Sequence, residues 1–140
     1  MLTDNDCASY TLFFDGCSKG NPGIAGAGAV LYKNQIEINA QSSFVGEKET
    51  NNVAEYHGLI MGMEIATSLG IKNMHVKGDS LLIIKHMKGE FKVNSPRLRP
   101  LFIRAKVLEK RIGFVKDEHV YRENNKRADE LANQGLLMKV

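Results

Sequence analysis

The feature that most constrains the fold is the short apolar run Tyr10–Phe14 (YTLFF), which ends abruptly at Asp15. An apolar run of this length is typical of a buried β-strand. The segment that follows, Gly16–Gly28, is rich in glycine and contains an Asn-Pro-Gly triplet, which predicts a turn. Two more strands are predicted over Ala29–Tyr32 and Gln35–Phe44, joined by a tight turn. The chain is therefore expected to begin with a three-stranded antiparallel meander.

Beyond the meander, helical and strand patterns alternate. A helix is expected over Asn51–Leu69, because Thr50 or Asn51 can cap its start and Gly70 stops it. The later elements are a strand over 73–77, a helix over 80–88, a basic helix from Ser95–Pro96 to Arg111, a strand over 114–121 and a closing helix over 125–137. The order βββαβααβα predicts an α/β fold, a five-stranded mixed β-sheet flanked by α-helices. One domain is expected over residues 10–138, after a tail of residues 1–9.

Composition excludes several classes of protein. With 43% hydrophobic and 25% charged residues among 140, the chain is not expected to be disordered. It contains no apolar run of the roughly 18 to 20 residues that a membrane helix needs, and its first residues do not resemble a signal peptide. A soluble cytoplasmic protein is therefore expected. Cys7 and Cys17 are expected to be free thiols, with a single bridge as the alternative.

Positive charge is concentrated in one stretch, although the net charge is only +3. Nine lysines and arginines lie between Lys85 and Arg111, against the two acidic residues Glu90 and Glu109. Such a stretch is typical of a solvated surface, and contact with nucleic-acid phosphates is the alternative. His57, His75 and His86 are expected to be structural or exposed.

Four acidic residues occupy positions where they could converge. Asp15 and Asp79 follow predicted strands, and ligands of open α/β sheets bind at strand ends. Glu55 is in helical phase with Leu59 and Met63, which is costly unless the carboxylate has a partner. Asp129 lies in the first turns of the last helix.

Each of these carboxylates also has a purely structural explanation. Asp79 could cap a helix, Asp129 could favour its helix dipole, and Asp15 could be a turn residue. Four converging carboxylates would repel one another unless hard cations such as Mg²⁺ were bound. Two such ions, about 4 Å apart, could activate a water molecule and stabilise the leaving oxygen at a phosphodiester.

Four segments resemble the signature segments of ribonuclease H type 1: Asp15–Gly23, Thr50–Glu55, Gly78–Ser80 and Asn125–Ala132. They occur in the family's order and spacing, and the resemblance extends from about Tyr10 to Leu137. It implies that Asp15, Glu55, Asp79 and Asp129 hold two Mg²⁺ ions, with Mn²⁺ as a possible substitute. It also implies that substrate is contacted by Gly16, Cys17, Ser18, Asn21, Asn51 and Asn52, and that Thr50 holds a phosphate of the DNA strand.

The sequence departs from the family pattern in two places. The segment before Asp129 is short and lacks the loop histidine of many members, which resembles the archaeal-type subgroup with an arginine there. Arg122 is the candidate for that role, with a surface salt bridge to Glu123 or Glu130 as the alternative. His119 could also approach the site, although its strand is expected to point the ring away. The basic protrusion with tryptophan is absent, since the chain has no Trp.

The resemblance implies an endoribonuclease that hydrolyses the RNA strand of RNA–DNA hybrids with two metal ions, leaving 5′-phosphate and 3′-hydroxyl ends. A monomer that binds the hybrid duplex and no membrane is expected. Two alternatives stay open. One is a nucleic-acid-binding module of the same fold with weak catalysis, which the presence of all four carboxylates argues against. The other is a relaxed nuclease that also cuts double-stranded RNA.

Overall fold

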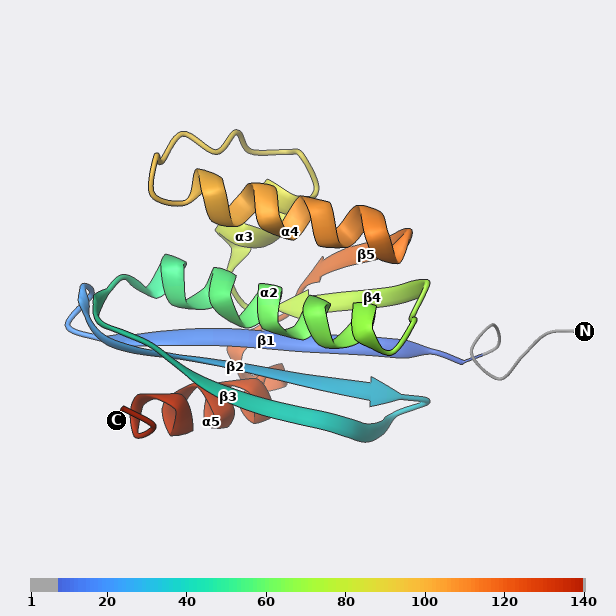
Figure 1. Cartoon of the computed structure of the whole chain (residues 1–140), viewed down its shortest axis with the longest axis horizontal. Helices are drawn as coiled ribbons and strands as arrows, with labels where there is room; N and C mark the ends of the chain where they lie inside the picture. The colour runs from blue at the N-terminus through green and yellow to red at the C-terminus, as the bar shows by residue number, and fades with distance from the viewer. Residues whose placement is uncertain (1–7, 140) are drawn as a thin grey trace, which may run out of the picture.

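A five-stranded sheet with the order β3-β2-β1-β4-β5 organises the fold in the computed structural model, which describes residues 8–139 (Figure 1). Its first three strands pair antiparallel, whereas β4 pairs parallel with both β1 and β5. The predicted mixed sheet is therefore confirmed. The strands are β1 (Tyr10–Lys19), β2 (Gly23–Lys33), β3 (Ile36–Glu49), β4 (Asn73–Gly78) and β5 (Phe114–His119).

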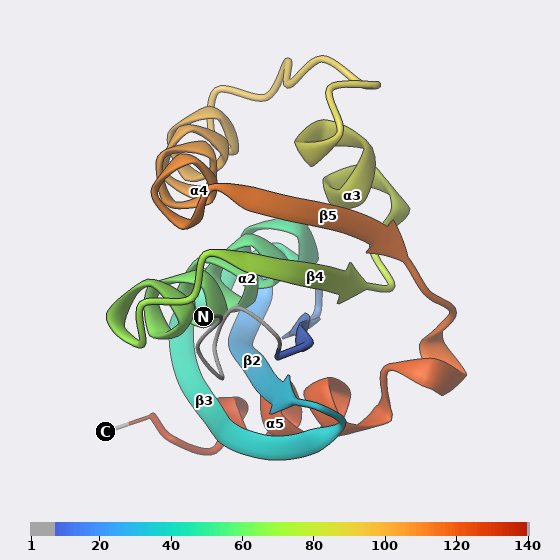
Figure 2. The same cartoon turned by 90° about the vertical axis from the view of Figure 1, so that its right-hand side faces the viewer.

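Helices cover both faces of this sheet. They are α2 (Asn51–Ser68), α3 (Leu81–Met87), α4 (Arg99–Ile112), the short 3-10 helix η1 (Arg122–Asn124) and α5 (Lys126–Leu136). The helices α2, α3 and α4 lie on one side and α5 lies on the other (Figure 1). Figure 2 shows α3 and α4 beside the β4–β5 edge of the sheet. The predicted order βββαβααβα is confirmed, and within residues 8–139 only η1 was not predicted from the sequence patterns.

The long helix α2 begins and ends as predicted. The Thr50 hydroxyl accepts a hydrogen bond from the Val53 N–H at 3.2 Å, which satisfies a free donor of the first turn. Gly70 follows the last turn with φ +72°, a conformation that glycine adopts without strain. Leu59 and Met63 on this helix are fully buried. Burial of this face holds α2 against β1 and thereby fixes the direction of its first turn.

The glycine-rich segment Gly16–Gly28 is not the long turn that its composition predicts. Only residues 20–22 form the turn, and both neighbouring strands extend into the segment. The glycines serve close packing instead. A Cβ atom on Gly26 would lie 2.3 Å from the Ala132 carbonyl oxygen, and one on Gly28 would lie 2.6 Å from the Ala128 carbonyl oxygen. These strand glycines therefore let α5 lie directly on β2.

Other predicted boundaries also shift. The basic helix begins at Arg99 rather than Ser95, because the chain first makes a turn in which the Leu98 N–H donates to the Ser95 hydroxyl at 3.2 Å. The fifth strand ends at His119, two residues early. The predicted domain start coincides with the start of β1, whereas residues 1–7 of the predicted tail, including Cys7, lie outside the described residues.

Cys17 is a free thiol. No helix within residues 8–139 is long and apolar enough to cross a bilayer.

A buried pair of acidic side chains lies between β5 and α4. Asp117 is 8% exposed, and the Asp117 Oδ1 and Glu109 Oε2 atoms are buried without a donor. The Lys106 ammonium donates at 2.9 Å to the other Glu109 oxygen and at 2.9 Å to the Met87 carbonyl. Burial, followed by the nearby negative charge of Glu109, raises the pKa of Asp117 to about 7, although Lys106 and Lys88 oppose this. Asp117 therefore keeps its proton under conditions in which an exposed carboxyl would have lost it.

We predict that Asp117→Asn stabilises the protein increasingly as pH rises. A carboxyl whose folded pKa is raised contributes stability below its unfolded pKa near 4 and loses it as pH climbs to about 7. The amide keeps a donor for Glu109 and does not ionise. The free energy of unfolding should rise by roughly 1 to 3 kcal/mol at about pH 8 and change little at about pH 4. Urea melts across this range measure it, with the neighbouring half-buried Glu118→Gln as control. If the stability of the wild type and of Asp117→Asn depended equally on pH, the raised pKa of Asp117 would be contradicted.

Candidate active site

Strand pairing brings Asp15 and Asp79 together. Phe14 pairs with Gly78 in the parallel β1–β4 ladder, and Asp79 is the first residue after β4. The sequence predicts Asp15 at the end of the first strand, and this prediction is wrong. Asp15 lies within β1 opposite Gly28 of β2, at the point where β1 extends beyond the end of β4. The two carboxylates therefore come from adjacent strands at the same level of the sheet.

The third carboxylate comes from the first turns of α2. A Cβ atom on Gly16 would lie 2.2 Å from the backbone of Ala54 and of Glu55, so β1 and α2 touch through their main chains here. This contact places Glu55 over the β1–β4 junction. One ligand oxygen from each of Asp15, Glu55 and Asp79 lies within 4.8 Å of the others. The predicted convergence is therefore present for these three.

Asp129 joins the group from the opposite face of the sheet. It lies on α5, within hydrogen-bonding contact of Asp15, but outside the group of three. All four carboxylates line one open hollow of about 510 Å³, here called the carboxylate hollow. Its lining residues are Asp15, Gly16, Cys17, Ser18, Lys19, Asn51, Glu55, Asp79, His119, Tyr121, Arg122, Asp129 and Asn133. The helix cap before α3 is Ser80 rather than Asp79, which leaves the Asp79 carboxylate for the hollow.

Burial and mutual repulsion together raise the pKa of two carboxylates in this hollow. Burial first, and then the charge of Asp79, raises the pKa of Asp15 to about 8. Burial, followed by Asp15 and Asp79, likewise raises the pKa of Glu55 to about 8. Hard divalent cations bind carboxylate oxygens, and a bound cation would replace the protons that otherwise relieve this repulsion. The donor set and its spacing therefore fit Mg²⁺ or a similar ion.

We predict that Asp15→Asn stabilises the metal-free protein at high pH. The raised pKa means that stability is greatest below about pH 4 and declines as pH rises to about 8. In chelator at about pH 8, the variant should be roughly 1 to 3 kcal/mol more stable than wild type, and similar to it at about pH 4. Adding Mg²⁺ should raise the melting temperature of wild type more than that of the variant. Thermal melts with Glu90→Gln as an exposed control measure both effects. An equal Mg²⁺ response in the two proteins would remove Asp15 from the cation site.

The predicted substrate-binding residues form a hydrogen-bonded edge beside the carboxylates. The Ser18 N–H donates to the Asn51 side-chain oxygen at 2.7 Å, and the Asn51 N–H donates to the Asn21 side-chain oxygen at 2.9 Å. The Ser18 hydroxyl donates to the Glu49 carbonyl at 2.6 Å. These bonds tie the β1–β2 turn to the start of α2. Gly16, Cys17, Ser18 and Asn51 therefore line the carboxylate hollow from one rigid edge.

The other three predicted binding residues, Asn21, Thr50 and Asn52, line a second hollow of about 490 Å³. We call it the basic hollow because Lys92 and Arg97 line it too. Its full lining is Asn21, Thr50, Asn52, Val53, Leu82, His86, Lys92, Asn94, Ser95, Arg97 and Leu98. The start of α2 contributes to both hollows, through Asn51 on one side and Thr50 and Asn52 on the other. His86 is structural, as expected, because it is buried and hydrogen-bonded to Tyr56; its position in the lining of this hollow was not predicted.

Arg122 and His119 both line the carboxylate hollow. Arg122 forms none of the ion pairs found within residues 8–139, and Glu130 instead pairs with Arg127 at 3.2 Å. The salt-bridge alternative for Arg122 is therefore wrong. The expectation that His119 points away is also wrong, because the end of β5 brings it to the hollow. Its ring meets the exposed Tyr121 ring edge-on, with centroids 5.6 Å apart.

Asn133 is a lining residue that the sequence analysis missed. It lies four residues after Asp129, one helical turn along α5. Its amide donates to the Asp129 carbonyl at 2.9 Å and to the Asp129 carboxylate at 3.3 Å. Its oxygen accepts a long hydrogen bond from the Cys17 thiol at 3.9 Å. Asn133 therefore helps to orient the Asp129 carboxylate, and the four-residue spacing from an acidic residue was the signal available in the sequence.

Comparison with known proteins gives consistent matches. The family model described as reverse transcriptase-like matches residues 13–135. A bifunctional protein of Mycobacterium tuberculosis is 41% identical over 123 residues, which are 87% of this chain and 34% of that protein. The ribonuclease HI of Halobacterium salinarum is 40% identical over 124 residues, 89% of this chain and 62% of that protein. The chain therefore spans about a third of the first relative and less than two thirds of the second.

Solved structures agree. Ribonuclease H1 from Halobacterium salinarum has a TM-score of 0.88 and 36% identity, covering 94% of this chain and 99% of that chain. LC11-RNase H1, solved in complex with an RNA/DNA hybrid, has a TM-score of 0.85 and 34% identity, covering 91% and 96% respectively. The family match includes the strands and helices that carry all four carboxylates. The chain therefore belongs to the reverse transcriptase-like family and, within it, to the ribonucleases H.

Proposed function

We propose that this protein is an endoribonuclease that hydrolyses the RNA strand of RNA–DNA hybrids, leaving 5′-phosphate and 3′-hydroxyl ends. The observation that carries this proposal is the grouping of Asp15, Glu55 and Asp79 within 4.8 Å, in a hollow that Asp129 and Arg122 also line. Acidic side chains repel nucleic-acid phosphates, so a surface made for binding alone would gain nothing from them. Their presence favours a cation-dependent reaction at phosphate.

Asp15, Glu55, Asp79 and Asp129 would hold two Mg²⁺ ions, with Mn²⁺ as a substitute. Bound ions would supply the positive charge that acidifies a water molecule and neutralises the phosphate. The protein itself contributes by holding these carboxylates in fixed positions. Asp15 and Asp79 are fixed by the parallel β1–β4 ladder, and Asn133 hydrogen-bonds to the Asp129 carboxylate.

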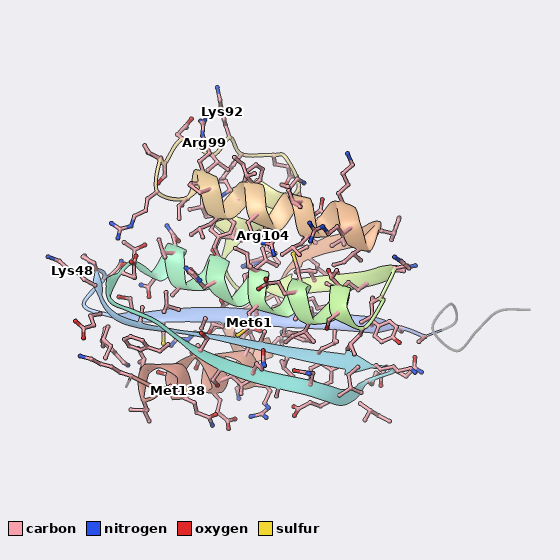
Figure 3. All side chains as sticks on the ribbon, viewed as in Figure 1. Lys48, Met61, Lys92, Arg99, Arg104 and Met138 are labelled. Carbon is pink, nitrogen blue, oxygen red and sulfur yellow. The ribbon has the colours of Figure 1, made fainter. Side chains whose placement is uncertain are left out.

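The hybrid is the substrate that the two hollows fit best. The polar edge beside the carboxylates presents the Ser18 hydroxyl and the Asn51 amide, and such short polar groups suit the 2′-hydroxyl that distinguishes RNA from DNA. The basic hollow would take phosphates of the other strand, with Thr50 as one ligand. Figure 3 shows Lys92 projecting outward from the segment before α4, where a duplex backbone could reach it. The relative solved with an RNA/DNA hybrid supports this substrate class.

The central experiment is cleavage of labelled RNA–DNA hybrid, double-stranded RNA and double-stranded DNA, each with Mg²⁺, with Mn²⁺ and with chelator. We predict that Asp79→Asn keeps the fold and lowers kcat on the hybrid by at least about 100-fold, since a neutral amide is a poor ligand for a hard cation. Circular dichroism is the folding control. Near-normal turnover by Asp79→Asn would remove this residue from the cation shell.

The same assay separates the alternatives. Binding of hybrid without cleavage by the wild type would favour a non-catalytic binding module. Cleavage of double-stranded RNA in the Mg²⁺ or Mn²⁺ arm would extend the substrate range. Sedimentation of the protein alone tests the expected monomer, and localisation in the cytoplasm stays a prediction.

A second prediction concerns Arg122. Its exposed guanidinium lines the carboxylate hollow and has no acidic partner among residues 8–139, so it is available to a phosphate. Arg122→Ala should lower kcat by roughly 10- to 1,000-fold, about 1.4 to 4 kcal/mol of barrier. Arg122→Lys should recover part of this, because a point charge cannot replace a bidentate fork.

His119→Ala is the matched comparison, since His119 lines the same hollow. We expect a smaller loss, through the edge-on contact with Tyr121. The pH profile distinguishes the two residues, because proton transfer by histidine would make activity follow a single group near neutral pH. If His119→Ala lost most of its kcat while Arg122→Ala stayed close to the wild type, the catalytic role would belong to the histidine.

A further inference from the structure

Beneath the basic hollow lies a buried hydrogen bond between two aromatic side chains. The hydroxyl of Tyr56, on α2, lies 2.7 Å from Nδ1 of His86, on α3. Tyr56 is 0% exposed and His86 is 4% exposed. Their ring planes differ by 15°, with centroids 6.1 Å apart. The 2.7 Å separation of the Tyr56 oxygen and Nδ1 is that of a close hydrogen bond between two buried groups.

Satisfaction of the buried Tyr56 hydroxyl fixes the tautomer of His86. If Nδ1 carried the proton and donated it, the Tyr56 O–H would need another acceptor, and residues 8–139 provide none. A buried O–H without an acceptor is costly, whereas donation from Tyr56 to a bare Nδ1 satisfies both groups. A tyrosine hydroxyl keeps its proton at neutral pH, so Tyr56 can act as the donor in this bond. The neutral His86 ring must then carry its own proton on Nε2.

This leaves Nε2–H as the one ring donor of His86 that has no hydrogen-bond partner among residues 8–139. His86 lines the basic hollow, and because Nδ1 is occupied by Tyr56, the polar group that it can offer there is Nε2–H. Burial lowers the pKa of His86, which keeps the ring neutral at physiological pH. Val53, Leu82 and Leu98 line the hollow beside it and provide no competing side-chain acceptor.

The surrounding donors indicate an anionic ligand. Thr50 and Asn52, at the start of the 18-residue helix α2, and the cations Lys92 and Arg97 line the same hollow. Backbone N–H groups at a helix start also favour negative charge. Arg97 already pairs with Glu49 at 3.0 Å, so its charge is partly compensated. A neutral donor such as the Nε2–H of His86 can bind an anion without adding to the positive charge of Lys92 and Arg97.

We propose that His86, held by Tyr56 as the Nε2–H tautomer, donates a hydrogen bond to a backbone phosphate of the bound nucleic acid. The inference rests on the proposed function for the identity of the ligand, but the tautomer does not. Tyr56 is a positioning residue in this arrangement. Because His86 is neutral, it contributes affinity without releasing counterions, unlike Lys92 and Arg97.

The first measurement is the tautomer itself. Long-range ¹H–¹⁵N NMR correlations of the wild type should show His86 protonated on Nε2 and bare on Nδ1 from about pH 6 to pH 8. Titration with inorganic phosphate should then shift the His86 Nε2 resonance and leave that of His75, on the exposed side of β4, unchanged. A proton on Nδ1, or an Nε2 resonance that phosphate does not move, overturns the inference whether or not the protein cuts hybrids.

The second measurement is hybrid binding in an Asp79→Asn background, where cleavage does not interfere. The variants are His86→Leu, His86→Gln and the double change Tyr56→Phe with His86→Leu, which removes both partners and leaves no buried group unsatisfied. His86→Leu and the double variant should raise Kd about 3- to 10-fold. His86→Gln should stay within about 3-fold of the parent, because an amide can accept from Tyr56 and still donate. His75→Leu is the matched control.

Salt dependence separates a neutral donor from a cation. The slope of log Kd against log salt should be unchanged in His86→Leu and shallower in Lys92→Gln. Parent-like affinity in the folded double variant, or a slope that falls with His86→Leu, overturns the proposal. Absence of any hybrid binding by the parent would instead overturn the proposed function and leave the phosphate titration to decide the role of His86.

Discussion

Mutual repulsion among buried carboxylates is the constraint on which the site depends. Asp15 and Glu55 lie close to each other and to Asp79, and burial together with this proximity raises the pKa of both to about 8. Such an arrangement lowers stability unless protons or cations compensate it. It persists because the sheet and α2 fix the backbones from which these side chains project. The fold therefore maintains an electrostatic strain that a bound divalent cation would relieve.

Close backbone packing makes that arrangement possible. Gly16 lets β1 touch the start of α2, and Gly58 lies where a Cβ atom would be 2.4 Å from the Asp15 carbonyl oxygen. Gly26 and Gly28 do the same between β2 and α5. Because no side chain separates these elements, helices from opposite faces deliver Glu55 and Asp129 to one point. A methyl group at any of these contacts would force the elements apart and move a ligand.

The start of α2 connects the two hollows, which together form the proposed nucleic-acid-binding surface. Asn51 faces the carboxylate hollow, whereas Thr50 caps the helix and lines the basic hollow. The Tyr56–His86 bond then ties the same helix to α3, which follows Asp79. A shift of α2 would thus change both hollows together. The Tyr56–His86 hydrogen bond is a polar contact between buried side chains, and it fixes the orientation of the His86 ring at the basic hollow.

Sequence patterns were enough to predict the order of elements, the approximate span of α2 and the four carboxylates, because periodicity, capping and motif spacing are properties of neighbouring residues. How these parts meet depends on tertiary packing. Gly16, Gly26 and Gly28 resemble a loop in sequence, yet they are strand residues in contact with helices. For Gly26 and Gly28 that helix is α5, about 100 residues away in the sequence. His119 and His86 likewise carry no local signal. Their positions depend on strand register and helix packing, which a linear pattern does not contain.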